Sequence, residues 1–309
     1  MNNSSLEKEV EWRMGNAYNS SFEWLGSQSD QHAENLGFGL DRVNWGDETF
    51  TKYMNRSEKS LPRQSILFKN WEKNKPSTLY IGGDRSYGRP GECVISQARG
   101  VKDSDVILYT DHKMFIKPQF DFTSIDHSIN AFNEKKPVLV WRGNSTGGTT
   151  EFQKRTGLAK YKINRRHFCE TFSDKPYVDA KIATVRKNFM HPSDQNDYKY
   201  ILSLEGNDSS SNPRWIFSTN SVSFMPKQHT SELTWHYHIK PWEHYVPFEY
   251  DLSDVKQKIE WCEAHPGECY DIIQHANEVF KLVTDYNRER QILQLMFERI
   301  NRNLIHDEN

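Results

Sequence analysis

The chain has 309 residues, of which 36% are hydrophobic and 13% aromatic, so large rings must supply much of the buried area of a globular protein. Its 40 lysine and arginine residues nearly balance 42 acidic residues. This balance provides no long-range attraction for nucleic acid or for an acidic membrane, so any anion must be bound locally. The length exceeds the roughly 100 to 200 residues typical of one domain, which predicts two domains.

Cysteine spacing and apolar runs indicate the compartment. The cysteines form no Cys-x-x-Cys pair and no Cys/His cluster with zinc-site spacing, which predicts free thiols in a reducing compartment. Residues 1–14 have no basic start and no apolar run, so we expect no signal peptide. No segment approaches the roughly 20 apolar residues of a membrane span. We therefore expect a cytoplasmic protein with at most peripheral association at the inner face of a membrane.

Strand-like runs begin in the second quarter of the chain. Residues 1–60 are polar and weakly periodic, and they predict irregular helix and loop. Later runs are short, apolar and followed by glycine or polar residues, which is typical of buried parallel strands with ligands at their carboxyl ends. Helix-length segments separate them, so an α/β fold is expected. The predicted strands are 78–81, 106–109, 138–141, 200–204 and 222–225.

Helix signals dominate the C-terminal part. Asn212 suits an N-cap and Pro213 a first helical position, so a short helix is predicted that Asn220 closes. Ser253 is placed to cap a helix over 255–264. Pro266 opens a second helix, and 288–305 forms a third. One face of that third helix carries Ile292, Leu295, Met296, Arg299 and Ile300, and the N-terminal domain is a candidate to cover it.

The run 140–150 leads from a strand into a loop rich in glycine and hydroxyl groups. Such loops present backbone N–H groups to phosphate. The run lacks the Gly-Lys-Ser/Thr ending of a P-loop, so a kinase or ATPase has little support. An ordinary surface turn is the alternative, because glycine loops are common.

A second polar loop, 204–214, comes directly before the short helix. The positive end of the helix dipole and its free N–H groups meet there. Arg214 in the first turn is unfavourable for the dipole unless an anion bridges the two, which favours a diphosphate pocket. An exposed arginine with no ligand is the alternative.

Two acidic features lie in the N-terminal half. Asp84 follows a predicted strand end, where a carboxylate can act as a general base or simply cap a turn. Asp103 and Asp105 match the Asp-x-Asp pattern of metal-dependent sugar transferases. We interpret them as solvated turn acids before the strand at 106–109.

Three stretches in order resemble glycosyltransferase family 90. They are 198–206 (Tyr-Lys-Tyr-Ile-Leu-Ser-Leu-Glu-Gly), 239–247 (Ile-Lys-Pro-Trp-Glu-His-Tyr-Val-Pro) and 251–255 (Asp-Leu-Ser-Asp-Val). The similarity is clear over roughly 138–283 and weaker over 78–120. The resemblance implies a GT-B architecture with two Rossmann-like domains facing a cleft, and inverting transfer from a UDP-sugar without a required metal. The implied domains are 1–136 for the acceptor, with the helix 286–309 packing back on it, and 137–285 for the donor.

The resemblance also assigns roles to residues. It implies that Asp84 is the catalytic base and that Arg142 and Gly143 match the family's Arg-Gly pair. The loop 205–214 matches the donor loop, with Arg214 at the position of a lysine in the eukaryotic pattern. Together with the glycine- and hydroxyl-rich loop described above, these matches predict no metal ligand, no cofactor and the following donor-binding residues: Arg142, Gly143, Ser145, Thr146, Gly147, Glu205, Gly206, Asn207, Ser210, Asn212 and Arg214.

The acceptor class follows from the branch of the family. The sequence Glu-Gly-Asn-Asp at 205–208 is similar to the bacterial branch, which implies a lipopolysaccharide or capsule glycan, lipid-linked or free, as acceptor. A protein O-glycosyltransferase and a non-catalytic protein that binds nucleotide sugar or glycan are the alternatives. Glu232 and Trp235 lie where that branch carries an acid and a tryptophan. We expect His236 and His238 to be surface residues and not metal ligands.

Overall fold

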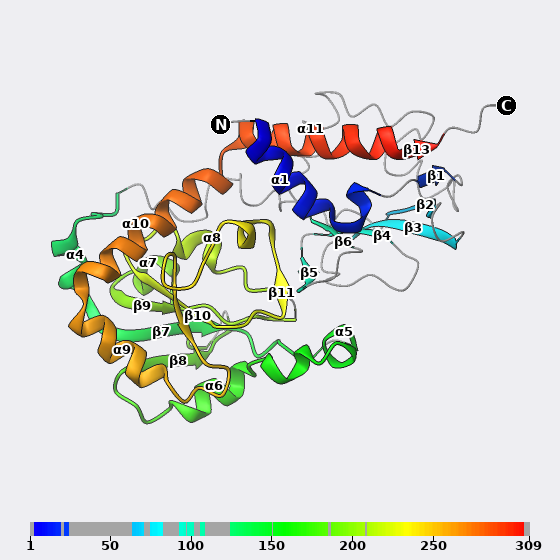
Figure 1. Ribbon diagram of the computed structural model, residues 1–309. Coiled ribbons are helices and arrows are strands. Elements are labelled where there is room, and N and C mark those ends of the chain that lie inside the picture. The colour runs from blue at the N-terminus through cyan, green and yellow to red at the C-terminus, as the bar shows by residue number, and fades with distance from the viewer. Residues whose placement is uncertain are drawn as a thin grey trace. The chain divides into compact units, whose positions relative to one another are not determined.

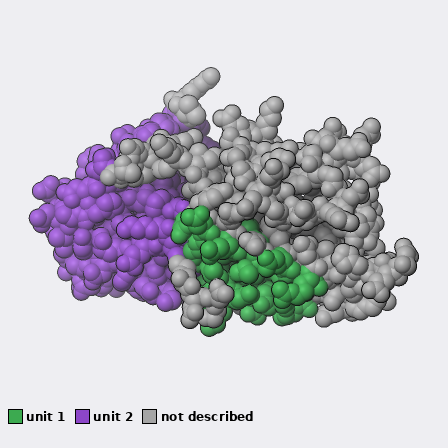
Figure 2. Space-filling model, turned by 90° about the horizontal axis from the view of Figure 1, so that it is seen from above, with its two compact units in different colours: residues 1–113, 232–237, 285–309 green, residues 114–231, 238–284 purple. Residues whose placement is uncertain are grey.

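The computed structural model describes most of the C-terminal part of the chain and several segments before it. The described residues are 3–19, 22–24, 64–70, 75–82, 93–96, 98–101, 106–108, 124–149, 151–184, 187–207 and 209–305. They belong to two compact units, coloured separately in Figure 2: unit 1 contains residues 1–113, 232–237 and 285–309, and unit 2 contains 114–231 and 238–284. The GT-B arrangement and the boundary at residue 136 stay predictions.

Unit 2 is built on a five-stranded parallel sheet (Figure 1). The α/β class is therefore confirmed, and so are the predicted strands 138–141 and 222–225, whereas the strand predicted over 200–204 covers 198–202. Two strands were not predicted. β8 (Val178–Ile182) lies at the edge of the sheet and has charged residues at alternate positions, and β12 (Val246–Phe248) has only three residues. In spatial order the strands are β8 (Val178–Ile182), β7 (Lys136–Gly143), β9 (Tyr198–Leu202), β10 (Val222–Pro226) and β12 (Val246–Phe248).

Both faces of this sheet are covered, which explains the unbroken apolar runs of its central strands. The larger core lies on the face that carries Trp141, Tyr200 and Phe224. Val140 and Ile201 point to the opposite face. The helices that pack on the larger core are α4 (Ile129–Asn133), α6 (Arg165–Thr171), α9 (Val255–Ala264) and α10 (Pro266–Val283), whereas α8 (Pro213–Ile216) covers the other face.

The order of the strands defines a switch point in the sheet, where the direction of the connections reverses. The chain runs from β7 through α5 (Glu151–Arg155) and α6 to β8 on one side of β7. It then crosses through α7 (Pro192–Gln195) to β9 on the other side and continues outward to β10 and β12. The connections diverge between β7 and β9, and ligands of doubly wound sheets bind at the carboxyl ends of the strands at such a switch point.

Two details of the predicted helices need correction. The short helix ends at Ile216 and not at Asn220, whose side chain donates to the carbonyl oxygens of Asp126 and Ser128 at 2.9 and 3.0 Å. The predicted bounds 255–264 are confirmed for α9, but Ser253 does not cap it. The N-cap residue is Asp254, and the hydroxyl of Ser253 donates to Asp251. In both places, local sequence predicted that a side chain would cap a helix end, but in the folded chain that side chain donates a hydrogen bond to another acceptor.

Unit 1 contains a six-stranded mixed sheet. The predicted strand 78–81 is confirmed as part of β3 (Lys75–Gly82), and the predicted strand 106–109 is confirmed over 106–108 as β6 (Val106–Leu108), since residue 109 is outside the described residues. β2 pairs antiparallel with β1 and β3, and the other neighbours are parallel. In spatial order the strands are β13 (Leu304–Ile305), β1 (Phe22–Trp24), β2 (Gln64–Asn70), β3 (Lys75–Gly82), β4 (Cys93–Ser96) and β6 (Val106–Leu108).

The first and last helices of the chain meet in unit 1 through buried charges. α1 (Asn3–Met14) carries Glu9 and Arg13, and α11 (Tyr286–Asn303) carries Arg288 and Glu289. Arg13 donates to Glu289 at 2.7 Å and to Glu9 at 2.6 Å, and Arg288 also donates to Glu9. Each of the four residues is at most 6% exposed. The charges of this quartet cancel, so their burial is compensated by their own pairing.

Two predictions about the whole chain can be compared with the described part. Cys169, Cys262 and Cys269 are free thiols, as expected. None of the helices described is long and apolar enough to cross a membrane.

Candidate functional site

The two loops that the sequence indicated meet at the carboxyl edge of the unit 2 sheet. The backbone N–H of Gly147, after β7, donates to the Oδ1 atom of Asn207, after β9, at 3.2 Å. Gly147 has a φ of 124°, which side chains rarely adopt, and a Cβ there would lie 3.3 Å from the carbonyl oxygen of Gly206. Glycine is therefore required where the two loops approach. This contact lies at the switch point between β7 and β9.

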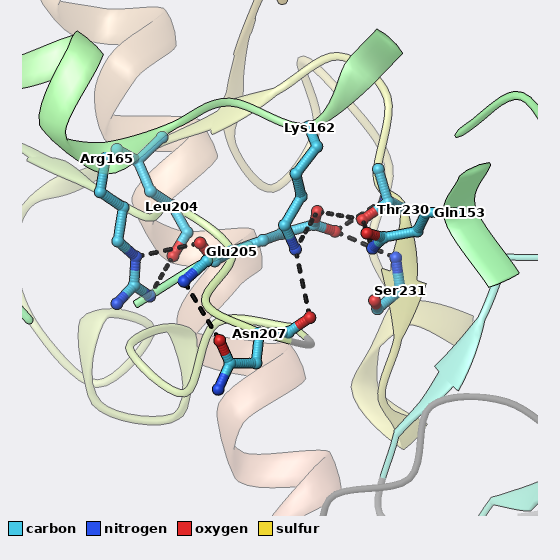
Figure 3. Close-up of polar contacts among 9 residues, drawn as sticks. Gln153, Lys162, Arg165, Leu204, Glu205, Asn207, Thr230 and Ser231 are labelled. Carbon is cyan, nitrogen blue, oxygen red and sulfur yellow. Dashed lines mark hydrogen bonds and ion pairs between the residues drawn. The ribbon is translucent and has the colours of Figure 1, made fainter. Parts of the chain in front are cut away.

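Arg165 joins the same two loops from the start of α6, and Figure 3 shows its contacts with Leu204 and Glu205 in the loop after β9. Its Nη2 and Nε donate to the carbonyl oxygens of Leu204 and Glu205 at 2.8 and 3.0 Å. Its Nη1 donates to the carbonyl oxygen of Asn144 and to the hydroxyl of Thr146, both at 3.1 Å. Three of these four contacts fix backbone carbonyl groups and the fourth holds a side chain, and the planar fork makes this geometry available to arginine alone.

The local sequence explains how Arg165 is held. Asn164 is the N-cap of α6, and its Oδ1 accepts from the backbone N–H groups of Arg166 and His167 at 2.9 and 3.1 Å. A Cβ on Gly206 would approach Nη2 of Arg165 to 3.1 Å, so this glycine leaves room for the guanidinium. Burial lowers the pKa of the Arg165 guanidinium, and the Glu205 charge opposes that change.

Glu205 is buried, and both of its carboxylate oxygens are occupied. Oε1 accepts from the backbone N–H groups of Thr230 and Ser231 at 2.7 and 3.0 Å. Oε2 accepts from the Thr230 hydroxyl and lies 3.5 Å from Nζ of Lys162. Gln153 donates to the same hydroxyl at 2.7 Å, as Figure 3 shows. Glu205 therefore connects the loop after β10 to the loop after β9.

Lys162 contributes a second cation to this cluster. Its side chain is only 1% exposed, and its Nζ lies 3.5 Å from the carbonyl oxygen of Asn207 as well as from Glu205. Lys162 and Arg165 thus place two cationic side chains against the loop after β9, which meets the glycine loop after β7. Cations beside a glycine loop are suited to a phosphate group.

The predicted residue Arg142 has a different set of partners. It lies on β7, and its guanidinium donates to the carboxylate and the carbonyl oxygen of Asp179 on β8 at 2.7 and 2.5 Å. Burial raises the pKa of Asp179, but hydrogen bonds from Arg142 and Lys181 outweigh burial and lower it. Arg142 thus links two strands, and binding of a donor by this side chain would require it to exchange partners.

The other predicted donor residues continue along the same loops. Gly143 ends β7, and Ser145 is exposed beyond it. Ser210 is buried, and its hydroxyl accepts from the backbone N–H of Asn212 at 3.3 Å. Arg214 lies in the first turn of α8 and is half-buried. The contacts of the site thus bring together Thr146, Gly147, Glu205, Gly206 and Asn207 from the predicted set.

The remaining candidates are not among the residues that these contacts join. Asp84, Asp103 and Asp105 fall outside the described residues. Glu232 belongs to unit 1, where it pairs with Arg99 at 2.9 Å. Trp235 stacks on His236 at 3.6 Å between ring centroids. Within the described ranges, no group of three or more His, Cys, Asp or Glu side chains is arranged to hold a metal ion.

Sequence reasoning did not identify Lys162, Arg165 or Thr230. A signal for Arg165 was present, since it is a cation in the first turn of a helix, the same argument that indicated Arg214. Lys162 is three residues before it. Thr230 carries no local signal, because its role depends on Glu205, which is 25 residues away.

The chain matches the sequence model of one protein family. The model of glycosyl transferase family 90 matches residues 117–297, more than half of the chain. The chain belongs to this family, and the resemblance drawn from its motifs is confirmed.

Several relatives are matched over part of their length. O-glucosyltransferase LpsA of Dichelobacter nodosus is 30% identical over 48% of this chain and 44% of that protein. Protein O-glucosyltransferase 2 of Danio rerio is 34% identical over 23% of this chain and 14% of that protein. Uncharacterized protein 179R of Invertebrate iridescent virus 6 is 25% identical over 73% of this chain and 16% of that protein. The chain thus spans less than half the length of these relatives.

One solved structure is similar at a low level. A glycosyltransferase from Rickettsia africae matches 67% of this chain and 63% of its own, with 12% sequence identity and a TM-score of 0.35. A TM-score of this size does not establish a common fold.

Proposed function

We propose that this protein is a glycosyltransferase that transfers a sugar from a UDP-sugar to a hydroxyl group of a glycan acceptor, of the lipopolysaccharide or capsule type, with inversion and without a metal ion. The observation that carries the proposal is the meeting of the loops after β7 and β9 at the switch point, where Arg165 fixes both. Family membership and the O-glucosyltransferase name of the Dichelobacter nodosus relative support it.

The leaving diphosphate is the group that this site suits. Its negative charge increases as the bond to the anomeric carbon breaks, and fixed cations and N–H groups stabilise that charge. Arg165 and Lys162 are held in place by carbonyl and carboxylate oxygens, so their positive charges are already positioned beside the loops when a donor binds. Arg142 and Arg214 are further proposed ligands of the donor. Removal of one such group typically costs about 10²- to 10³-fold in rate.

Asp84 is the proposed base. The acceptor hydroxyl loses its proton to this carboxylate while its oxygen attacks the anomeric carbon, and the nucleotide diphosphate leaves from the opposite face. This displacement forms one glycosidic bond, breaks one, and inverts the anomeric centre. A general base typically contributes about 10²- to 10⁴-fold.

A screen of UDP-sugars in the presence of a chelator tests the proposal. UDP release is measured for each sugar with and without glycan acceptors. We expect at least one donor to be consumed in chelator. The Asp84→Asn variant should lose roughly 10²-fold or more in transfer while retaining affinity for UDP.

Three results would contradict parts of this proposal. Strict dependence on an added divalent metal would return attention to Asp103 and Asp105. Near-normal transfer by a folded Asp84→Asn protein would remove Asp84 as the base and make Asp111 the next candidate. Transfer to a polypeptide and to no glycan would replace the proposed acceptor class.

A further inference from the structure

An exposed tryptophan is fixed in an unfavourable backbone conformation on unit 2. Trp242 is 41% exposed and has a φ of 65°, in the left-handed region that bulky residues avoid. The turn around it is closed by hydrogen bonds. The N–H of Trp242 donates to the carbonyl oxygen of Tyr245 at 2.8 Å, and the N–H of His244 donates to that of Lys240 at 3.0 Å. Surrounding contacts that hold a strained residue in place are typical of functional positions.

The ring of Trp242 is supported from the core outward. Trp261 packs against the main core of unit 2 and meets Trp242 edge to face, with ring centroids 4.7 Å apart and planes at 72°. The imidazole ring of His265 stacks on the indole ring of Trp261, with ring centroids 4.5 Å apart and planes at 13°. The exposed ring is therefore a rigid platform, and binding to it costs little conformational entropy.

The platform lies at the opposite edge of the sheet from the loops around Arg165. Trp242 comes just before β12 and Trp261 lies in the last turns of α9, which returns from the carboxyl end of β12. Both are therefore at the amino edge. Figure 1 shows the junction of α9 and α10 beside α4, which directly precedes β7. The Trp242 ring is thus not part of the candidate donor site.

Charges around the platform cancel. Nζ of Lys258 lies 4.8 Å from the centroid of the Trp242 ring and pairs with Asp254 at 3.5 Å. Lys240 pairs with Glu243 at 3.0 Å. A surface of paired charges has no net attraction for anionic lipid or nucleic acid. It complements an uncharged ligand that has both an apolar face and hydrogen-bonding groups.

The geometry points to a second carbohydrate-binding site at Trp242, which takes a neutral pyranose unit of a glycan chain. The axial C–H groups of a pyranose form an apolar face that packs on an indole ring. Its equatorial hydroxyl groups extend beyond the ring, and the pairs Lys258–Asp254 and Lys240–Glu243 supply hydrogen-bond donors and acceptors on the segments next to Trp242. This inference goes beyond the proposed function, because binding at the amino edge requires neither nucleotide nor transfer.

The test is a titration of the full chain with cellopentaose and with maltopentaose, without nucleotide, observed through the tryptophan indole N–H signals in a nitrogen-15 NMR spectrum. The Trp242 signal is assigned by its loss in Trp242→Gly, a change that suits the left-handed backbone. We expect this signal to shift saturably with at least one oligosaccharide. Trp242→Gly should weaken binding about tenfold or more, a loss typical of an aromatic anchor, as followed through the remaining indole signals. Trp242→Phe, which keeps a ring, should retain most of the affinity.

A matched variant separates binding at Trp242 from contact with any exposed ring. Phe189→Ala removes another exposed aromatic ring, 63% exposed, and should leave oligosaccharide binding unchanged. The inference is overturned if neither oligosaccharide shifts the Trp242 signal, or if Trp242→Gly binds as tightly as the unchanged protein. It is also overturned if phosphatidylglycerol vesicles, and no sugar, perturb that signal. Failure of UDP binding would not affect these outcomes, so the two proposals fail separately.

Discussion

The backbone N–H of Gly147 donates to Oδ1 of Asn207 across 3.2 Å, which joins loops that are 60 residues apart in the chain. The contact depends on Gly147 adopting a φ of 124° close to the carbonyl oxygen of Gly206. The shape of the candidate donor site is therefore sensitive to a single methyl group at this position.

Gly147→Ala tests this sensitivity. A non-glycine residue in such a conformation costs about 1 to 3 kcal/mol, so the loop should shift and UDP affinity should fall about tenfold. Gly148→Ala is the matched control, because a Cβ there meets nothing within 4 Å. Isothermal titration with UDP measures both. Equal affinities of the two variants would show that the loop does not shape the site.

Arg165→Lys keeps the charge of the side chain but removes the fork. A lysine cannot serve the carbonyl oxygens of Leu204, Glu205 and Asn144 together, and each buried acceptor left without a donor costs about 1 to 3 kcal/mol. We expect a lower thermal midpoint and UDP affinity reduced about tenfold or more. Arg166→Lys, at the exposed neighbouring position, should change neither. If Arg165→Lys behaved like Arg166→Lys, the guanidinium would not be holding the loops.

The buried quartet of α1 and α11 predicts a large effect on stability. Burial would lower the pKa of the Arg13 guanidinium, but Glu289 and Glu9 outweigh it and raise the pKa. Glu9→Gln leaves Arg13 and Arg288 with one carboxylate between them, and breaking such buried pairs costs about 3 to 5 kcal/mol. Urea denaturation measures the loss. Glu11→Gln, an exposed position on the same helix, should stay within about 0.5 kcal/mol of the unchanged protein.

Lys135 predicts how stability depends on pH. Burial lowers its pKa to about 7 in the folded protein, where Nζ donates to Asn196 and Ser221 at 2.8 and 2.9 Å. The unfolded chain holds this proton up to a pH of about 10.4, so it binds more protons than the folded protein above pH 7. The free energy of unfolding should therefore rise with pH from about 7 to about 10, by up to about 1.4 kcal/mol per unit.

Lys135→Met should remove this rise, whereas Lys136→Met, at an exposed neighbour, should retain it. Urea denaturation of the three proteins at several pH values between 7 and 10 measures the difference. The quantity to compare is the difference in the free energy of unfolding between the unchanged protein and each variant, taken at each pH. A difference from Lys135→Met that does not vary with pH would contradict the lowered pKa.

The sequence predicted the parts of the fold that local pattern determines. Unbroken apolar runs marked β7, β9 and β10 because both faces of these strands are covered. β8 was missed because it lies at the sheet edge, where Asp179 and Lys181 interrupt the run. Asn220 was assigned to a helix end, but carbonyl groups more than 90 residues earlier take its amide. Local propensity cannot anticipate such partners.

The candidate site was also predicted only where local sequence determines it. Glycine loops after strands pointed to Gly147 and Gly206, since their composition alone indicates close backbone approach. Arg165, Lys162 and Thr230 act through groups that are at least 19 residues away in the chain, so only the folded chain identifies them. Glu205 was predicted as a donor ligand, and the structure adds that it organises Thr230 and Ser231. The donor role of this loop stays a proposal.

The existence of a diphosphate site is tested by the equilibrium binding of UDP in the presence of a chelator. If the loops after β7 and β9 form a diphosphate site, calorimetry should detect saturable binding to the unchanged protein. Arg165→Met, which removes the cation and the fork, should weaken that binding by about 10- to 100-fold, in proportion to the loss of roughly 1.5 to 3 kcal/mol for a hydrogen bond to a charged group. UDP binding that is absent, or that is equally tight in folded Arg165→Met protein, would contradict the account.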